Sequence, residues 1–474
     1  MRTYSLVTFG CQMNQHDSDR VAEVLSAAGY EQREHVEDAD LVLLNTCSVR
    51  EKAEQKLRSE VGRLAELKRK KQGVALGLLG CVAQQEGERL LKRMPALDLV
   101  VGPDHIAALP ELLAELELGA LPLVRTGFDS EEPEFLSARP ELGGTRVSAF
   151  VTVMKGCDER CSFCIVPHTR GPERYRPASE IVSEIARLVA AGTREVTLLG
   201  QPVNSYRDPE TSQPEAPHSH LRNESQFARL LERVVREVPG LLRLRYTSPH
   251  PRHLTEALIR AHAELPPLVR HVHLPVQSGS NRVLKRMIRR YTVEDYEARV
   301  ARLRERVPGV TLSTDIIVGF PGETREDFQA TLDLVERVRF SGLFAFKYSV
   351  RPYTPAKQLA DDVSEEEKSA RLAELFELSE RHRRANLEAL LDRVEPVLVE
   401  GRSKGGAFSG RTERNEIVHF DAGGEDPTGL VVPVRIERAF KNSLFGAWLG
   451  RAPAESPPRA PATPRRSLPM FVGE

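Results

Sequence analysis

The 474-residue sequence has few cysteines, no long apolar run and no excess of charge of either sign. Six cysteines in so long a chain are too few for a disulfide scaffold, so metal binding or thiol chemistry is their more usual role. No apolar run approaches the ~20 residues of a membrane-spanning helix. The first residues, MRTYSLVTFGCQMN, also lack the pattern of a signal peptide. We therefore expect a cytoplasmic protein without a membrane partner.

The charges nearly cancel, with 67 Lys and Arg against 68 Asp and Glu and a formal net charge of −1. No overall field therefore attracts nucleic acid, and an RNA partner would need a local patch. The C-terminal part gives no such signal, because it holds eight basic and eight acidic residues between Val394 and Arg451.

The pattern of apolar runs divides the chain into α/β parts, as its length allows. Over residues 1–117, apolar runs alternate with amphipathic helical stretches, which predicts a parallel sheet with helices. Residues 118–145 are rich in Pro, Gly and acidic residues and are expected to be a linker. Residues 146–378 contain six further strand candidates in tandem. This second series indicates a partial barrel of six βα units.

The remaining segments differ in composition. A polar insertion at 205–222 is expected to form a mobile loop, and a charged helix is expected over 364–393. Short alternating strands within 381–451 predict a small β-barrel. The Pro- and Arg-rich tail, 452–474, is expected to be disordered.

Three cysteines, Cys157, Cys161 and Cys164, lie in GCDERCSFC after the first strand candidate of the second series. Barrels carry their chemistry at this end of their strands. Three thiolates can hold three irons of a [4Fe–4S] cluster and leave the fourth iron open to an added ligand. The alternative is a structural zinc site with His168 as fourth ligand, although such sites usually stand on small, poorly packed units.

The other three cysteines each follow an apolar strand candidate, in VTFGC, VLLNTC and LGLLGC. Cys11, Cys47 and Cys81 should therefore project from one edge of the N-terminal sheet, where open α/β sheets bind ligands. They could hold a second cluster, again with one open iron. The alternative is three buried, inert cysteines.

Several motifs resemble one known family. MKGCDERCSFCIVPHTRGPERYRP resembles the cluster-binding segment of the radical SAM methylthiotransferases. FGCQMN, NTCSVREKAEQK, LGCVAQ, LPVQSGSNRVLKRM, STDIIVGFPGET and SGRTERNEIVHF resemble the branch that converts N6-isopentenyladenosine at position 37 of tRNA to its 2-methylthio form. The likeness covers about residues 2 to 450.

The resemblance implies an N-terminal methylthiotransferase domain, a radical SAM domain and a C-terminal TRAM domain that grips RNA. It also implies S-adenosylmethionine as both radical source and methyl donor. The implied partners are the tRNA anticodon stem-loop and a low-potential electron donor such as flavodoxin or ferredoxin, with the chain acting as a monomer. The implied ligands are Cys11, Cys47 and Cys81 for an auxiliary [4Fe–4S] cluster and Cys157, Cys161 and Cys164 for the cluster that binds S-adenosylmethionine.

Other residues are candidates for contacts with cofactor or substrate. Polar groups at strand ends could bind S-adenosylmethionine or substrate, or could simply cap loops; they are Gln201, Asn204, Gln277, Ser278 and Asp315. Arginines and two aromatic rings could contact RNA phosphates or bases, or could simply be solvated; they are Arg170, Arg174, Arg176, Arg411, Phe408 and Phe420. The sequence departs from the family pattern at Pro202, Val350 and Tyr353.

Two alternatives remain open from the sequence. A sister enzyme with the same chemistry would act on threonylcarbamoyladenosine in tRNA or on an aspartate of a ribosomal protein. A protein of another class would use zinc or an iron–sulfur cluster to bind RNA without catalysis.

Overall fold

The computed structural model describes residues 2–48, 51–71, 73–119, 122–128, 134–143, 146–211, 224–403 and 405–450. They form two compact units, one reaching Ala389 and including Glu413–Asn415, the other formed by Leu390–Thr412 and the residues from Glu416. The tail at 452–474 and most of the polar insertion at 205–222 lie outside the described residues. Within those residues, no helix has the length and apolar character to cross a membrane.

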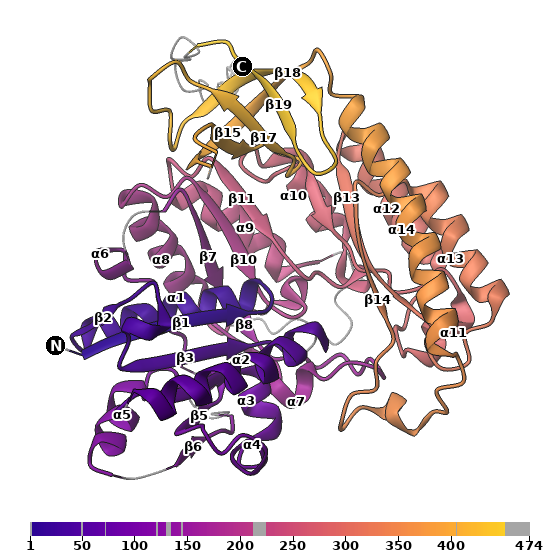
Figure 1. The fold of residues 1–474 in the computed structure, drawn as a ribbon. Helices are drawn as coiled ribbons and strands as arrows, with labels where there is room; N and C mark the ends of the chain where they lie inside the picture. The colour runs from indigo at the N-terminus through magenta and orange to yellow at the C-terminus, as the bar shows by residue number, and fades with distance from the viewer. Residues whose placement is uncertain are drawn as a thin grey trace, which may run out of the picture. The chain divides into compact units, whose positions relative to one another are not determined.

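The N-terminal part is a sheet of six parallel strands in the order β2-β1-β3-β4-β5-β6 (Figure 1). Helices cover both faces, because the buried side chains of β3 alternate between two apolar clusters: Val42 and Leu44 pack with α2, while Leu41 and Leu43 pack with α1 and α5. This confirms the parallel α/β sheet. The strands are β1 (Arg2–Phe9), β2 (Tyr30–Gln32), β3 (Leu41–Thr46), β4 (Ala75–Gly80), β5 (Leu99–Val101) and β6 (Leu123–Arg125), and the helices are α1 (Gln12–Ala27), α2 (Glu51–Lys70), α3 (Cys81–Glu86), α4 (Arg89–Arg93) and α5 (Leu109–Glu117).

The segment expected to be a linker contributes to this sheet. Strand β6 pairs in parallel with β5, with Val100 opposite Val124. Strand β6 is only three residues long and lies among Pro, Gly and acidic residues, so the sequence pattern did not predict it.

The second part contains six parallel strands in sequential order, which confirms the partial (βα)6 barrel. They form two three-stranded sheets, β7-β10-β11 and β12-β13-β14, and an isolated parallel bridge joins Leu244 to Leu268 between them. Figure 1 shows the helices on the outside of the strands. The strands are β7 (Ser148–Thr152), β10 (Glu195–Leu199), β11 (Arg243–Tyr246), β12 (His271–His273), β13 (Thr311–Val318) and β14 (Gly342–Lys347), and the larger helices are α8 (Ala178–Ala190), α9 (Gln226–Glu237), α10 (Glu256–Glu264), α12 (Val293–Arg306), α13 (Arg325–Val338) and α14 (Glu365–Glu388).

Local signals fix where these helices begin. Thr292 caps α12 and Thr324 caps α13, each in a capping box with an aspartate three residues later. Ser364 caps α14 by accepting from the amide of Glu367. The charged helix expected from the sequence therefore starts where predicted and ends at Glu388.

The interior of the partial barrel is polar. Strand residues that face the helices are apolar, such as Leu198 and Ile316, so the alternate residues face inward. Inward positions hold an ion pair between Arg245 Nε and Glu195 Oε2 at 2.9 Å. The hydroxyl of Ser313 contacts the rings of His271 and His273 at 3.1 and 2.9 Å. Barrels closed around a packed core carry branched apolar residues there, so this interior is built to face a ligand or water.

The C-terminal unit is a closed five-stranded barrel in the order β15-β16-β17-β19-β18, which confirms the predicted small β-barrel. Its strands alternate buried and exposed side chains, as a small barrel with a filled interior requires. They are β15 (Val394–Arg402), β16 (Phe408–Arg411), β17 (Ile417–Asp421), β18 (Val431–Ala439) and β19 (Leu444–Trp448).

Candidate functional site

The structure brings Cys11, Cys47 and Cys81 to one edge of the N-terminal sheet. Each follows one of the neighbouring parallel strands β1, β3 and β4, whose C-terminal ends meet at that edge. None of the three is in a disulfide; Cys47 and Cys81 are buried and Cys11 is half-buried.

Two asparagines hold these cysteine loops. The side-chain carbonyl of Asn14 accepts from the amide of Cys11 at 3.3 Å, and its Nδ2 donates to Asn45 Oδ1 at 3.1 Å. Asn45 in turn donates to the carbonyl of Asn14 at 2.9 Å. Gly80, just before Cys81, has a φ of +90°, and a Cβ there would lie 2.3 Å from Asn45 Oδ1. Sequence reasoning missed both asparagines as site residues, although each lies within three residues of a cysteine.

The charges around this first triad favour thiolates unequally. A hydrogen bond with the Cys47 side chain, helped by the nearby Arg170 guanidinium, lowers the pKa of Cys11 to about 6 against the effect of burial. Burial raises the pKa of Cys81, and the Arg170 cation only partly offsets it. A bound cation would therefore complete the deprotonation of the set, because metal ligands must be thiolates.

The second triad, Cys157, Cys161 and Cys164, lies in the loop after β8 (Met154–Lys155). The Cys157 amide donates to Gly171 at 3.1 Å, and the Cys164 amide donates to Cys161 at 3.1 Å. A Cβ at Gly156 would lie 1.8 Å from the carbonyl oxygen of Pro172, so only glycine allows this close approach.

Burial keeps Cys157 and Cys164 of the second triad protonated in the absence of a cation. Burial, followed by the charge of Cys164, raises the pKa of Cys157 well above that of an exposed thiol. Burial, followed by the charge of Cys161, raises the pKa of Cys164 to about 12. A site that makes two of its thiolates this costly fits a metal group, whose positive charge would stabilise them.

Within the described residues, neither triad places all three sulfur atoms as close together as the ligands of one zinc ion. Four ligands about 2.3 Å from one zinc ion lie roughly 3.8 Å apart in a tetrahedron. Throughout the described ranges, three or more metal-binding side chains have ligand atoms within 4.8 Å of one another in only one group, and that group contains no cysteine. His168 instead places its ring 5.6 Å from that of Tyr353.

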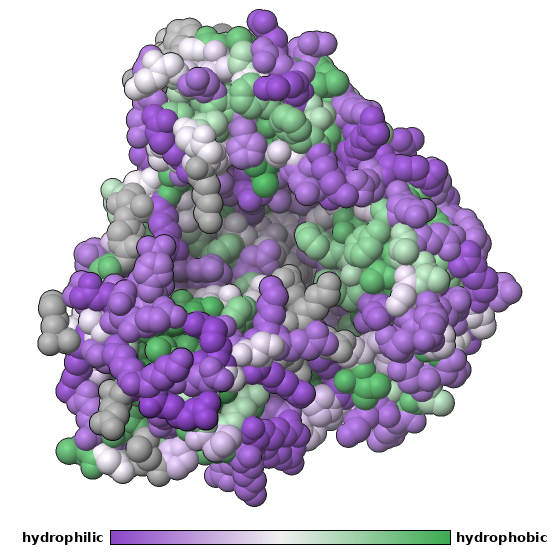
Figure 2. All heavy atoms as spheres, viewed as in Figure 1, coloured by the Kyte–Doolittle hydropathy of each residue, from purple (hydrophilic) through white to green (hydrophobic). Residues whose placement is uncertain are grey.

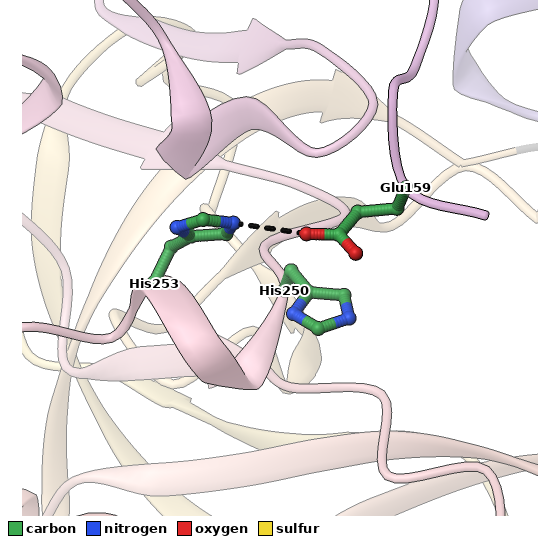
Figure 3. A group of neighbouring side chains, drawn as sticks. All are labelled: Glu159, His250 and His253. Atoms are coloured by element: carbon green, nitrogen blue, oxygen red, sulfur yellow. Dashed lines mark hydrogen bonds and ion pairs between the residues drawn. The ribbon is translucent and has the colours of Figure 1, made fainter. Parts of the chain in front are cut away.

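The one compact group is Glu159, His250 and His253 (Figure 3). Glu159 lies between Cys157 and Cys161, and both histidines follow β11. His253 Nε2 lies 3.1 Å from Glu159 Oε1. Sequence reasoning missed this group; the HPRH pattern after a barrel strand was its only signal.

The hydrogen bonds of His250 argue against a metal ion in this group. Its Nδ1 accepts from the amide of Arg252 at 3.2 Å, so Nε2 carries the proton in the neutral ring and has no lone pair to offer. Burial lowers the pKa of His250 and keeps the ring neutral. Its Nε2 and the Oε2 atom of Glu159 are both buried without a hydrogen-bond partner among the described residues. A ligand with both an acceptor and a donor would satisfy them.

The predicted polar contacts fall into two sets. Gln201 Oε1 is buried without a partner among the described residues, and Asp315 Oδ1 lies 3.4 Å from His273 Nε2 in the barrel interior. Asn204 instead fixes the backbone of His250, donating to its carbonyl at 3.0 Å. The remaining two support loops: Gln277 bonds strand β13 through its backbone, and Ser278 accepts from the amide of Ser280.

The three arginines after the cluster loop are buried ion-pair partners. Arg170 pairs with Asp17, Arg174 with Asp104 and Arg176 with Glu184. The three guanidinium groups already form ion pairs with these carboxylates, so the arrangement does not support phosphate binding by the three arginines.

In the C-terminal unit, Arg411 is partly exposed and pairs with Glu400 at 3.1 Å. Phe408 and Phe420 are fully buried and their rings stack 6.1 Å apart in the barrel core. The prediction that these two rings could stack on RNA bases is therefore wrong, because both face the interior of the barrel.

Apolar side chains gather over the edge strand β14 (Figure 2). Phe344 and Phe346 are 54% and 40% exposed, while the alternating Leu343 and Ala345 pack into the core, so both rings lie on the inner face. The ring of Phe344 lies 5.8 Å from that of His273, which contacts Asp315. Exposed aromatic rings beside a polar pair suit the stacking of a nucleobase.

Two positions that depart from the family pattern lie on the surface near this strand. Val350 and Tyr353 are each about half exposed. The hydroxyl of Tyr353 accepts from Arg89 Nη1 at 2.6 Å. This contact joins the end of the barrel to helix α4.

Three family models match the chain in succession. They are an uncharacterized protein family, UPF0004, over residues 3–102, the radical SAM superfamily over 151–335 and the TRAM domain over 391–449. Among solved structures, the radical S-adenosylmethionine methyltransferase TsrM of Kitasatospora setae matches with a TM-score of 0.53, at 18% identity over 75% of each chain. At that identity the likeness concerns the fold alone.

Curated relatives match over nearly the whole chain. A protein of Sorangium cellulosum named tRNA-2-methylthio-N(6)-dimethylallyladenosine synthase is 61% identical over 100% of both chains. Proteins with the same name from Myxococcus xanthus and Maricaulis maris are each 47% identical over 94% of this chain and 94% and 96% of their own. With its three domains and two cysteine triads, the chain belongs to the radical SAM methylthiotransferases.

Proposed function

We propose that this enzyme inserts a methylthio group at C2 of N6-isopentenyladenosine at position 37 of tRNA, next to the anticodon. The observation that carries the proposal is the pair of cysteine triads in one compact unit, one at the C-terminal edge of the N-terminal parallel sheet and one in the loop after β8. One triad would suffice for radical chemistry, and a second gives a place for sulfur. The names of the full-length relatives supply the substrate.

Two [4Fe–4S] clusters and S-adenosylmethionine, when bound, supply the radical, the sulfur transfer and the methyl group. Cys157, Cys161 and Cys164 would ligate the cluster that binds S-adenosylmethionine. Cys11, Cys47 and Cys81 would ligate the auxiliary cluster.

The other residues of the barrel mouth bind and orient. The unpaired atoms of Gln201, Glu159 and His250 offer hydrogen bonds to S-adenosylmethionine or substrate. Asp315 and Phe344 line the interior, where the carboxylate can accept from an exocyclic N–H and the ring can stack on the adenine. The adenosine must leave the stack of the anticodon loop to reach them.

We further propose that the C-terminal barrel, with Arg411 on its surface, binds the anticodon stem-loop. A low-potential donor such as flavodoxin or ferredoxin supplies the electrons, and the enzyme acts in the cytoplasm as a monomer. The proposed boundaries are 1–117 for the methylthiotransferase domain, 146–378 for the radical SAM domain and 381–451 for the TRAM domain.

The test is mass spectrometry of tRNA nucleosides from a strain that lacks the gene. We expect N6-isopentenyladenosine to accumulate and its 2-methylthio derivative to disappear, and the Cys161→Ala gene should not restore it. Unchanged 2-methylthio-isopentenyladenosine would reject the proposal, and loss of a methylthio derivative of threonylcarbamoyladenosine would point to the sister substrate.

A further inference from the structure

Arg170 connects the two cysteine triads. It lies at the end of the short helix α7 (Val166–Arg170), six residues after Cys164, yet its side chain reaches the other triad. Its Nε donates to Cys81 Sγ at 3.2 Å. Its Nη2 and Nη1 lie 2.6 and 3.4 Å from the carboxylate oxygens of Asp17. One guanidinium therefore holds both a thiol and a carboxylate of the N-terminal sheet domain.

The surroundings keep this group charged although only 3% of it is exposed. Burial alone would lower the pKa of Arg170, but the charges of Asp17, Cys81 and Cys11 raise it well above its usual range. A buried cation is costly unless anions surround it, and Asp17 supplies only one. The remaining anionic partners are the thiolates that would bind iron.

The contact is specific to this arginine within its segment. Arg174 and Arg176 follow it and are equally buried, but they pair with the carboxylates of Asp104 and Glu184. Arg174 also donates to the carbonyl of Arg170 at 2.9 Å, which fixes the end of α7. Helix α7 packs against α3, whose first residue is Cys81.

We infer that Arg170 is a positioning residue that raises the reduction potential of the auxiliary cluster and ties its ligand Cys81 to the loop carrying the other triad. The inference rests on the proposed function, in which Cys11, Cys47 and Cys81 hold that cluster. Reduction adds negative charge to a cluster, and both an N–H donor to a ligating sulfur and a nearby cation stabilise the reduced form. Asp17 has the opposite electrostatic effect, since its carboxylate disfavours added negative charge.

The test is a potentiometric titration, followed by EPR, of the full-length holoenzyme with both clusters. S-Adenosylmethionine alters the signal of the cluster that it binds and so identifies the other. We expect Arg170→Gln to lower the auxiliary potential by about tenfold in the reduction equilibrium, or ~59 mV for one electron. Asp17→Asn should raise it. Arg176→Gln, the matched control, should leave it unchanged, because Arg176 is also buried but pairs with Glu184.

The opposite signs of the two shifts distinguish an electrostatic role from simple damage to the fold. If Arg170→Gln does not take up the cluster, Arg170→Lys replaces it in the test. Because lysine retains the positive charge, we expect its auxiliary potential to fall by less than ~59 mV. The inference would be overturned by an unchanged potential in Arg170→Gln or by shifts of the same sign in Arg170→Gln and Asp17→Asn. It would also be overturned by an auxiliary potential in Arg170→Lys that is higher than that of the unchanged enzyme. If the unchanged enzyme binds only about four irons, the proposed function fails instead.

Discussion

Nη1 of Arg289 lies 3.3 Å from Sγ of Cys161, while Nη2 of the same guanidinium donates to the carbonyl of Pro275 at 3.1 Å. Each cysteine triad thus has one buried arginine that donates to one of its thiols. Arg289 links the cluster loop to the strand end after β12, near the inward-facing His273.

The Arg289→Gln variant should lower the reduction potential of the cluster that binds S-adenosylmethionine, because it removes a cation and a sulfur hydrogen bond. We expect slower reductive cleavage of S-adenosylmethionine, measured as 5′-deoxyadenosine formed with a chemical reductant. Arg286→Gln is the control, since Arg286 Nε donates to the carbonyl of Pro321 at 3.0 Å. Equal rates in the Arg289→Gln variant and the unchanged enzyme would contradict this role.

The two triads should be separable by single substitutions. Cys161→Ala and Cys81→Ala should each reduce the iron content from about eight to about four atoms per chain. Only Cys81→Ala should still cleave S-adenosylmethionine, and neither should form the methylthio product. Loss of cleavage in Cys81→Ala, with its circular dichroism unchanged, would argue against two independent clusters.

Alkylation of the reduced, metal-free chain should depend on pH differently at each cysteine. Only the thiolate reacts, and Cys11 has a pKa lowered to about 6 while that of Cys157 is raised. Labelling of Cys11 should therefore rise as the pH passes through about 6 and level off above it, whereas Cys157 should remain slow to pH 9. Peptide mass spectrometry measures both, and faster labelling of Cys157 at pH 7 would refute the assignment.

Gly80→Ala should destabilise the N-terminal sheet domain and impair the auxiliary site. The new Cβ would combine a strained φ of +90° with a contact of 2.3 Å to Asn45 Oδ1, and we expect a cost above the ~1–3 kcal/mol of strain alone. Gly73→Ala is the matched control, because its φ is +85° but nothing lies within 4 Å of its Cβ. Thermal unfolding and iron content measure the difference, and equal losses in both variants would show that the clash is harmless.

Phe344→Ala should weaken binding of an isopentenylated anticodon stem-loop by about 1–3 kcal/mol, the usual range for loss of a base–aromatic stack. Phe376 is exposed to a similar degree on the outer helix α14, so Phe376→Ala serves as control. Fluorescence anisotropy with labelled RNA measures both affinities. The same small loss in the two variants would exclude a stacking role for Phe344.

The sequence predicted the main features that depend on local pattern. Strand candidates followed by cysteines predicted that Cys11, Cys47 and Cys81 converge, because parallel strands end at a common edge. The contacts of Arg170 could not be predicted in this way, because its partners Asp17 on α1 and Cys81 on α3 both lie far from it in sequence. For the same reason, an arginine suited to phosphate by its chemistry proved to be an internal ion-pair partner.

Errors of detail have similarly physical causes. Strand β6 is too short to stand out from a Pro- and Gly-rich segment. Asn204 has the chemistry of a ligand contact, but its amide bonds the backbone of His250 in both directions. The role of Asn204, which follows β10, therefore depends on the loop of His250, which follows β11.

In the partial barrel, the residues that stabilise the fold differ from the polar residues that face the interior. Its stability comes from the apolar layer between strands and helices, so residues such as His273 and Phe344 can change without emptying that layer. Mutations on the inner face should therefore be tolerated by the fold even when they alter what the enzyme accepts. An inner face free to vary in this way gives one scaffold a route to new substrates while its iron ligands stay in place.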